Sequence, residues 1–502
     1  MQKKQTILVV ASLLVVVLSV TLAYFTAQII GKGKDVSVTS TTLQIVFTDS
    51  DGAISGSNIE PGWSDTKTFT VENNSKSEYK YNIVIKDLLN TFVTNGYLQY
   101  KITSTNGGYN MTEFKDIPKS SIATDTILAY SVVIPNGVTQ SYTIEFKYAN
   151  DESVDQSDDM GKKLSGTLFI TEGTEDPNKT LYNQLLADKS TKLTRTDFSK
   201  VLTDNNTKTL YTSTEDSKTV YYFAGNATDN WVKFGKNASN QDLYWRIIRT
   251  NSDGGVRLLY HGTSTTATDA YIGTSAFNTT YNNSMYVGYM YGTSGAQASN
   301  RTNENSSTIK TAIDNWYVSN LEAKGYTKYL STTAVYCNDR EVGSGTYSAT
   351  GSTFYYAAYA RLNTNKTPTY DCTNINDKFT VDTSTGNGKL TYPIALMTAD
   401  EISYAGGLYG TNAPTWYYYN SANGSSTGST WWWLLSPNYW NGGSANVFSV
   451  GGSSGPGYLS HNYVHYTYGV RPAISLKSCI KYSTGNGSAS DPYTIKETAS
   501  RC

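Results

Sequence analysis

The sequence predicts a mainly β protein, in which an antiparallel β-sandwich is followed by a C-terminal domain of α+β structure. Three observations lead to this prediction. Short runs of alternating apolar and polar residues fill residues 36–171, a polar stretch follows, and further strand patterns after residue 218 are accompanied by two helical patterns. A length of 502 residues exceeds what one hydrophobic core organises, so two or three domains are expected.

Residues 1–27 are predicted to be a signal peptide or an N-terminal transmembrane anchor. The chain opens MQKKQ, and Thr6 to Phe25 then contains no charged residue. A basic start followed by about 20 apolar residues is typical of an export signal, and the length also fits a membrane span. We therefore expect an extracellular protein, either secreted or anchored to the cell surface, which contacts a membrane only if this segment stays uncleaved.

Residues 28–171 are predicted to form the β-sandwich. Seven runs alternate with a period of two and are separated by turn residues, which favours strands that each bury one face. The runs are Leu43–Phe47, Thr68–Val71, Tyr81–Ile85, Leu98–Ile102, Leu128–Ile134, Tyr142–Tyr148 and Gly166–Ile170.

Residues 172–217 are predicted to be a polar linker, because EGTEDPNKT, KSTKLTRTDFSK and DNNTK are rich in charged and small polar residues. Within this stretch, Leu181–Lys189 fits a short helix capped by Thr180, too short and too isolated to form a domain.

Residues 218–502 are predicted to form the second domain. Helical spacing of apolar residues from Ile309 to Leu321 predicts one amphipathic helix. A second helix should begin after Thr398, where Thr-Ala-Asp-Glu fits a capping box, and should end near Gly406. The predicted strands are Val220–Phe223, Trp231–Phe234, Tyr244–Arg249 and Val256–Tyr260, the last two forming a hairpin around Asn-Ser-Asp-Gly-Gly.

The four cysteines agree with an oxidising exterior. Their spacing favours two local disulfides, Cys337 with Cys372 and Cys479 with Cys502, out of three possible connectivities. Thiolate zinc is the competing reading, but no Cys-x-x-Cys pair occurs in the sequence.

The segment from Ile402 to Val470 contains no Asp, Glu, Lys or Arg. Between Asn438 and Tyr468, 22 of 31 residues are Gly, Ser, Tyr, Asn or His, a composition typical of antibody contact surfaces. This composition predicts a ligand-binding surface, although an ordinary Gly/Ser-rich hairpin array explains it equally well. The predicted ligand-binding residues are Asn438, Tyr439, Asn441, Tyr458, His461, Asn462, Tyr463, His465, Tyr466 and Tyr468, all expected to be exposed.

Several motifs in the second domain carry a resemblance to a known group of proteins. WWWLLSP (431–437), Ala-Asn-Val (445–447) and GVRPAISL (469–476), with YWRIIRTNSDGGVRLLYHG, AVYCNDR and LMTADEISYAGG upstream, resemble secreted bacterial domains with the C-type lectin fold. That group is related to the formylglycine-generating enzymes and to the variable proteins of diversity-generating retroelements. The resemblance implies core strands at Trp431–Trp433 and Val470–Leu476, with a long irregular surface excursion between them.

The N-terminal region carries a second resemblance. Pro-Gly-Trp (61–63), TKTFTVENNS and VIPNGVTQSYTIEFKY resemble the sandwich domains of camelysin-like and biofilm-fibre proteins. The metallopeptidase activity described for camelysins is not expected here, because the sequence has no His-Glu-x-x-His helix and its first histidine is His261.

Catalysis and bound cofactors are not expected. No cysteine pair lies close to the uncharged segment, and the carboxylates Asp339, Asp400 and Glu401 are explained by a helix cap and a loop ion pair. His461 and His465 have metal-ligand spacing only on a helix, and the surrounding glycines and proline are not helical. A net charge of −1 and the lack of a basic patch argue against nucleic acid as a partner.

We therefore expect an adhesin-like, cell-surface protein that binds an extracellular protein or glycan. The alternatives are a structural subunit of an extracellular matrix or fibre and, less favoured, an enzyme of the formylglycine-generating type. The Asn, Tyr, Ser, Gly and His content of 438–468 also fits a retroelement-diversified segment, in which adenines of Asn codons are altered. Drift in a Gly/Ser-rich loop is the competing explanation, and Trp440 could not arise by that mechanism.

Overall fold

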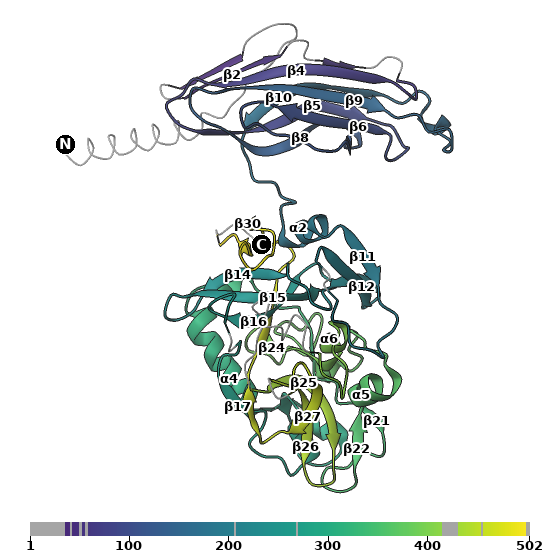
Figure 1. Cartoon of the computed structure of the whole chain (residues 1–502), viewed down its shortest axis with the longest axis vertical. Helices are drawn as coiled ribbons and strands as arrows, with labels where there is room; N and C mark the ends of the chain where they lie inside the picture. Colours follow the sequence, from purple (N-terminus) through teal and green to yellow (C-terminus); the bar gives the residue numbers. More distant parts are fainter. Residues whose placement is uncertain are drawn as a thin grey trace, which may run out of the picture. The chain divides into compact units, whose positions relative to one another are not determined.

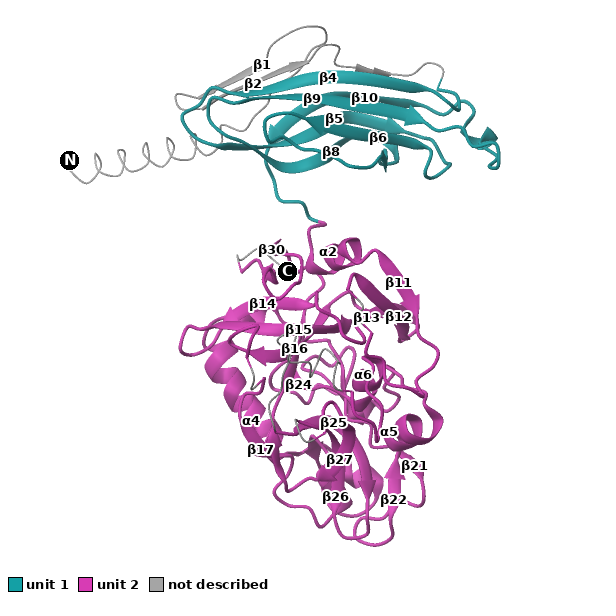
Figure 2. Cartoon of the chain, viewed as in Figure 1, with its two compact units in different colours: residues 1–177 teal, residues 178–502 magenta. Residues whose placement is uncertain are grey.

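The computed structural model describes residues 36–40, 43–49, 53–55, 59–204, 207–267, 270–413, 430–452 and 455–497, with side chains from residue 59 onward. The chain divides into two compact units, residues 1–177 and 178–502 (Figure 2). The predicted export segment, 1–27, lies outside the described residues. Within the described ranges, no helix is long and apolar enough to cross a membrane.

Unit 1 consists of antiparallel strands in two sheets (Figure 1). One sheet has the order β1-β2-β4-β9-β6-β7 and the other β3-β10-β5-β8. The strands are β1 (Val36–Ser40), β2 (Leu43–Asp49), β3 (Ala53–Ser55), β4 (Ser64–Asn73), β5 (Tyr79–Asn90), β6 (Leu98–Ser104), β7 (Lys115–Asp116), β8 (Ser120–Ile134), β9 (Thr139–Tyr148) and β10 (Leu164–Glu172). Each of the seven predicted runs lies within one of these strands, so the strand predictions are confirmed.

The period-two pattern explains how unit 1 forms its core. Alternate side chains of a strand point to opposite faces. In β9, Tyr142, Ile144 and Phe146 are buried, while β5 and β10 of the other sheet bury Ile83 and Leu168 in the same apolar cluster. Both sheets therefore contribute one face to a shared core.

Unit 2 contains a ten-stranded and a seven-stranded sheet (Figure 1). The ten-stranded sheet follows the order β11-β12-β13-β15-β14-β31-β30, and β16, β29 and β24 extend it from β15. Its strands are β11 (Thr191–Thr194), β12 (Thr209–Glu215), β13 (Lys218–Tyr222), β14 (Trp231–Lys236), β15 (Asp242–Thr250), β16 (Val256–Gly262), β24 (Ile394–Leu396), β29 (Pro472–Leu476), β30 (Tyr482–Thr484) and β31 (Tyr493–Ile495).

The seven-stranded sheet follows the order β17-β28-β25-β22-β21, with β26 paired to β25 and β27 to β26. Its strands are β17 (Thr274–Ala276), β21 (Val342–Ser344), β22 (Phe354–Tyr356), β25 (Trp432–Trp440), β26 (Ala445–Val450), β27 (Leu459–Tyr463) and β28 (Thr467–Gly469). Two small sheets pair β18 (Met290–Tyr291) with β19 (Asn305–Ser306) and β20 (Tyr336–Cys337) with β23 (Lys378–Phe379).

Both helices predicted for the second domain form. Helix α4 (Thr308–Tyr317) starts at Ser307, whose side chain accepts a hydrogen bond from the Lys310 N–H, and buries Ile309 and Ile313. Helix α6 (Ala399–Tyr404) starts with the predicted capping box between Thr398 and Glu401. The other α-helices of the described residues are α2 (Leu181–Asp188), α3 (Gln297–Asn300) and α5 (Ala357–Tyr359).

The prediction of a polar linker over residues 172–217 is corrected by the structure. Residues 178–217 belong to unit 2, because α2 buries Leu181 and Leu185 in its core and β11 and β12 join its large sheet. The isolated helix is too short to be stable alone, so its apolar face forms only with tertiary contacts. All four residues of β11 are exposed, and an exposed edge strand leaves no alternating pattern in the sequence.

The expectation of an irregular surface excursion between Trp433 and Val470 is also corrected by the structure. Strands β25, β26, β27 and β28 occupy most of it. The apolar run Ala445–Val450 is buried along its whole length, and the Gly- and Ser-rich segments on either side of β26 are connections. Composition obscured this sheet because the connections that flank β26 are rich in glycine and serine.

Candidate binding face

Strand pairing places several of the predicted ligand-binding residues on one side of the seven-stranded sheet. Directly paired residues share a face, and neighbours along a strand alternate. Tyr355, Tyr439, His461 and Tyr463 therefore lie on one face, whereas Asn462 points to the other. The pairs that define this face are Tyr355 with Tyr439, Tyr439 with Asn446, Asn446 with Tyr463, and Phe448 with His461.

A closed circuit of contacts joins five side chains on this face, here called the aromatic cluster: Tyr355, Tyr359, Tyr409, Tyr439 and His461. Tyr355 stacks on Tyr359 and on Tyr439, with ring centroids 4.4 and 5.5 Å apart. Tyr409 meets the Tyr359 ring at 5.7 Å, and Tyr439 meets the His461 ring edge-on at 5.0 Å. A 2.6 Å hydrogen bond between the Tyr409 hydroxyl and His461 Nδ1 closes the circuit.

The aromatic cluster is uncharged at neutral pH. Burial lowers the pKa of His461 below its ordinary value of 6.5, so the imidazole is neutral, and its Nδ1 shares a hydrogen bond with the Tyr409 hydroxyl. Burial raises the pKa of Tyr409 and of Tyr439, and the next contributions come from neighbouring tyrosines. Each side chain of the cluster is half-buried and so presents an edge to solvent.

Asn438 is corrected from an exposed contact residue to a buried one. Its side chain is 0% exposed and lies beside Tyr409, where it opposes the rise of the Tyr409 pKa. Neither amide atom makes a hydrogen bond of good geometry within the described part of the chain. A buried amide of this kind is costly, and it stands beneath the cluster rather than on it.

A second aromatic group adjoins the cluster through Tyr463. The Tyr463 ring lies 5.9 Å from that of His465 and 5.5 Å from that of Tyr466, which is 42% exposed. Tyr468 continues the group 6.4 Å from Tyr466. The Trp431 ring contacts the rings of both Tyr468 and Tyr458, with centroids 6.2 Å apart in each pair.

Asn441 and His465, two more of the predicted ligand-binding residues, lie outside the aromatic cluster. Asn441 accepts hydrogen bonds from the N–H groups of Gly443 and Ser444, so it shapes the β25–β26 turn. His461 lies in a strand, and His465 follows it and packs on Tyr281 at 4.3 Å, so the two histidines do not share a helical face. Across the described ranges, no group of three or more His, Cys, Asp and Glu side chains could hold a metal ion.

Sequence reasoning missed Tyr355, Tyr359 and Tyr409. Tyr355 and Tyr359 stand four residues apart in YYAAYARL, a spacing that brings side chains together at the start of a helix. Tyr409 lies inside the uncharged segment but upstream of the stretch whose composition drew attention. The signal that joins these residues to β25 and β27 is strand pairing, which composition does not contain.

The carboxylates considered as catalytic candidates form buried ion pairs. Glu401 forms ion pairs with Arg249 and Arg257 at 2.9 and 2.8 Å. Burial acts to raise the pKa of Glu401, but the two arginines outweigh burial and lower it. Arg361 bonds Asp400 at 2.9 Å and Asp339 at 2.6 Å, but burial outweighs the ion pair and raises the pKa of Asp339.

These ion pairs line a small polar cavity of about 20 Å³, which has room for about one water. Its lining includes the three arginines, the carboxylates of Asp339, Asp400 and Glu401, and Tyr370. We interpret the network of ion pairs around this cavity as structural.

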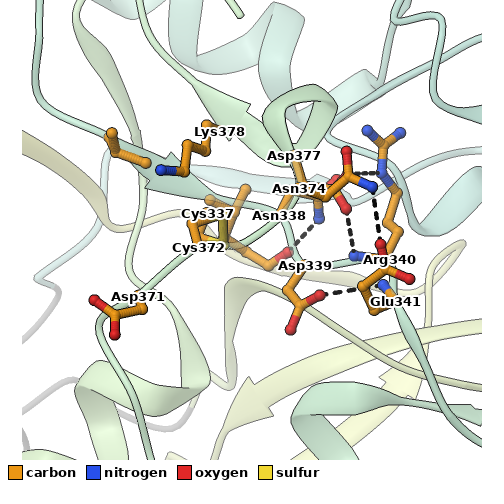
Figure 3. The surroundings of a disulfide bond; sticks show 12 residues. Cys337, Asn338, Asp339, Arg340, Glu341, Asp371, Cys372, Asn374, Asp377 and Lys378 are labelled. Atoms are coloured by element: carbon orange, nitrogen blue, oxygen red, sulfur yellow. Dashed lines mark hydrogen bonds and ion pairs between the residues drawn. A yellow bond between two sulfur atoms is a disulfide. The ribbon is translucent and has the colours of Figure 1, made fainter. Parts of the chain in front are cut away.

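The predicted disulfide between Cys337 and Cys372 is confirmed, with Cα atoms 5.8 Å apart (Figure 3). Two residues shortly after Cys337 form ion pairs: Arg340 with Asp377 at 2.6 Å, and Asp339 with Arg361. Asn374, two residues beyond Cys372, donates to Glu341 at 2.8 Å. Cys502 lies outside the described residues, so the pairing of Cys479 with Cys502 stays a prediction.

Comparison with known proteins gives one family and one distant structure. A ruminal GH26 endo-beta-1,4-mannanase matches at 14% identity over 29% of each chain, with a TM-score of 0.15, a likeness too slight to carry an argument. No curated protein matches the chain. Residues 270–478 match the family described as "Domain of unknown function (DUF6273)", a span that contains every strand of the seven-stranded sheet and all five residues of the aromatic cluster.

Proposed function

We propose that the chain is an exported, cell-surface binding protein whose aromatic cluster contacts an uncharged region of an extracellular ligand. In this proposal a β-sandwich of the camelysin type carries a C-type lectin-like domain, and the N-terminal hydrophobic segment directs export. The two antiparallel sheets with a shared core in unit 1, and the two helices that pack with β-sheets in unit 2, support that assignment of folds.

One observation carries the proposal. Five aromatic side chains converge on one sheet face from distant parts of the sequence: β22 and α5, the segment after α6, β25, and β27. Tyrosine combines a large apolar ring with a hydroxyl edge, and such residues are enriched where proteins bind other molecules. The lack of charge in the surrounding sequence favours ligands without an ionic group at the contact.

The direct experiment is to screen the full-length protein against glycan arrays and cell-surface protein arrays, and then to measure affinity for any ligand found. Replacing Tyr439 or His461 with Ala should weaken binding, and an anchor tyrosine contributes about 2 kcal/mol, or roughly thirtyfold in Kd. Asn462→Ala is the matched control, because it changes the same strand on the opposite face. Equal losses for the cluster variants and the control would contradict the proposed face.

Binding at this face should not require a divalent cation. Calcium prefers carboxylate oxygens, and the sequence from Ile402 to Val470 offers none. Affinity should therefore be unchanged in a chelator. Affinity that disappears in chelator and returns with calcium would place the binding site elsewhere on the molecule.

A further inference from the structure

A buried lysine–aspartate pair lies where α2 meets the large sheet of unit 2. Lys189 follows the last residue of α2, and its Nζ is 2.8 Å from Asp229 Oδ2. The side chains are 2% and 9% exposed. The two residues are 40 positions apart in the sequence, so the contact ties α2 to the segment just before β14.

The Lys189–Asp229 pair makes few of the hydrogen bonds that its two charged groups could form. An ammonium has three N–H donors, and within the described residues Asp229 is the only hydrogen-bond acceptor of Lys189 Nζ. Its other neighbours are the rings of Phe223 and Tyr493, with centroids 5.9 and 5.4 Å away. Asp229 Oδ2 also accepts the Lys208 N–H at 2.7 Å, whereas its Oδ1 has no hydrogen-bond partner in the described part of the chain.

Burying two charges with so few compensating bonds is costly, and the cost falls if the pair becomes neutral. Proton transfer along the existing hydrogen bond gives an amine beside a carboxylic acid, the two reactants of amide formation, in contact and shielded from water. Orientation and exclusion of solvent are the conditions under which such a condensation is accelerated. Tyr493 is fixed over the site because its hydroxyl donates to Asp188 at 2.7 Å.

We propose that Lys189 and Asp229 become joined by an intramolecular amide bond. The lone pair of neutral Lys189 Nζ attacks the Asp229 carboxyl carbon, the new C–N bond forms, and the C–O bond to the hydroxyl group breaks. The hydroxyl leaves as water together with a proton from the nitrogen, and no oxidant or reductant is needed. The product is a neutral amide, which removes both charges from the interior.

The position of the bond gives it a mechanical role. Unit 2 begins at Asn178, and α2 is the first element after that boundary. A pull applied from the N-terminal side would reach Lys189 and pass directly to Asp229, without unravelling β11, β12 and β13. This role rests on the proposed surface anchoring, whereas the bond itself does not.

The test is peptide mapping by mass spectrometry of the reduced, full-length protein. A linked pair of peptides containing Lys189 and Asp229, lighter by one water than their sum, is the expected result. Separate, unmodified peptides from folded protein would overturn the proposal. The pair Lys310 and Asp314 is the internal control, because its Nζ and Oδ2 are also in contact but its carboxylate is 19% exposed.

Two variants make the result specific to these atoms. Asp229→Ala should abolish the link, and a loss of water that persists in it would show that the loss arises elsewhere. Asp229→Asn should restore the link by release of ammonia, giving a product of the same mass as the linked wild type. An Asp229→Asn protein that folds but contains no link, beside a linked wild type, would contradict direct attack on the carboxyl carbon.

Discussion

Replacing Glu401 with Gln should lower the free energy of unfolding of unit 2 by about 3 kcal/mol, because breaking one partner of a buried ion pair typically costs 3–5 kcal/mol. Glu401 Oε1 lies 2.9 Å from Arg249 and 2.8 Å from Arg257, and all three side chains are at most 3% exposed. The lower end of the range applies, because Arg249 keeps a second ion pair with Glu215 at 2.7 Å. Gln also retains an oxygen for the capping box with Thr398.

Chemical denaturation followed by tryptophan fluorescence is the suitable assay. Eight of the nine tryptophans lie beyond residue 178, so the signal reports mainly on unit 2. The matched control is Asp242→Asn, which removes contacts to two partly exposed lysines and should cost less than about 1 kcal/mol. If Glu401→Gln costs no more than this control, the buried network does not stabilise the fold.

Three further predictions concern stability. Lowering the pH should destabilise unit 2 in two stages. Burial lowers the pKa of His461, so His461 opposes folding progressively below pH 6.5. Despite its burial, Glu401 has a pKa that its two arginines lower, so the stability it contributes is fully present above pH 4.5 and is lost as the pH falls from there through the folded-state pKa; a denaturation series from pH 8 to about 2 covers both stages. Removing the Cys337–Cys372 disulfide, which spans 35 residues, should cost about 3 kcal/mol, measured by denaturation of the Cys337→Ser, Cys372→Ser double variant beside the wild type. Gly406→Ala should cost more than about 1 kcal/mol, because φ is +115° and a Cβ would lie 2.5 Å from the Leu202 carbonyl oxygen; an unchanged midpoint would contradict that contact.

The strands and helices of both units were largely predictable from local pattern. In β9 the buried residues alternate strictly, so the residues that face the core can be identified from the sequence. Helix α6 was equally clear, because Thr398 and Glu401 form the two hydrogen bonds that their spacing predicts. Patterns of this kind survive because each element buries its apolar side against a core.

The candidate face was less predictable, because it depends on pairing between segments. Tyr439 and His461 were found by composition, whereas Tyr355 reaches them only because β22 pairs with β25. The same composition wrongly included Asn438, since an amide typical of a contact surface also fits beside a buried tyrosine. In α2, packing of Leu181 and Leu185 outweighs a weak local signal, which made a structured segment resemble a linker.

Burial also narrows the hypothesis that a retroelement diversified this segment, which competes with drift in a Gly/Ser-rich loop. Asn438 and Asn446 are 0% and 1% exposed, and adenine changes at Asn codons there would place Tyr, His or Asp inside the sheet. Diversification is therefore expected only at half-exposed positions of the face, chiefly Tyr439, His461 and Tyr463.

The test is genomic: a nearby near-copy of the coding segment should carry adenines at those three codons and match the gene at the buried ones, beside a reverse transcriptase gene. Adenine differences concentrated at the buried codons would contradict a functional diversified face, because most products would overpack the core. A locus with neither a near-copy nor a reverse transcriptase would refute diversification and leave a fixed aromatic surface, whose affinity would then be set by one arrangement of tyrosines rather than by selection among many.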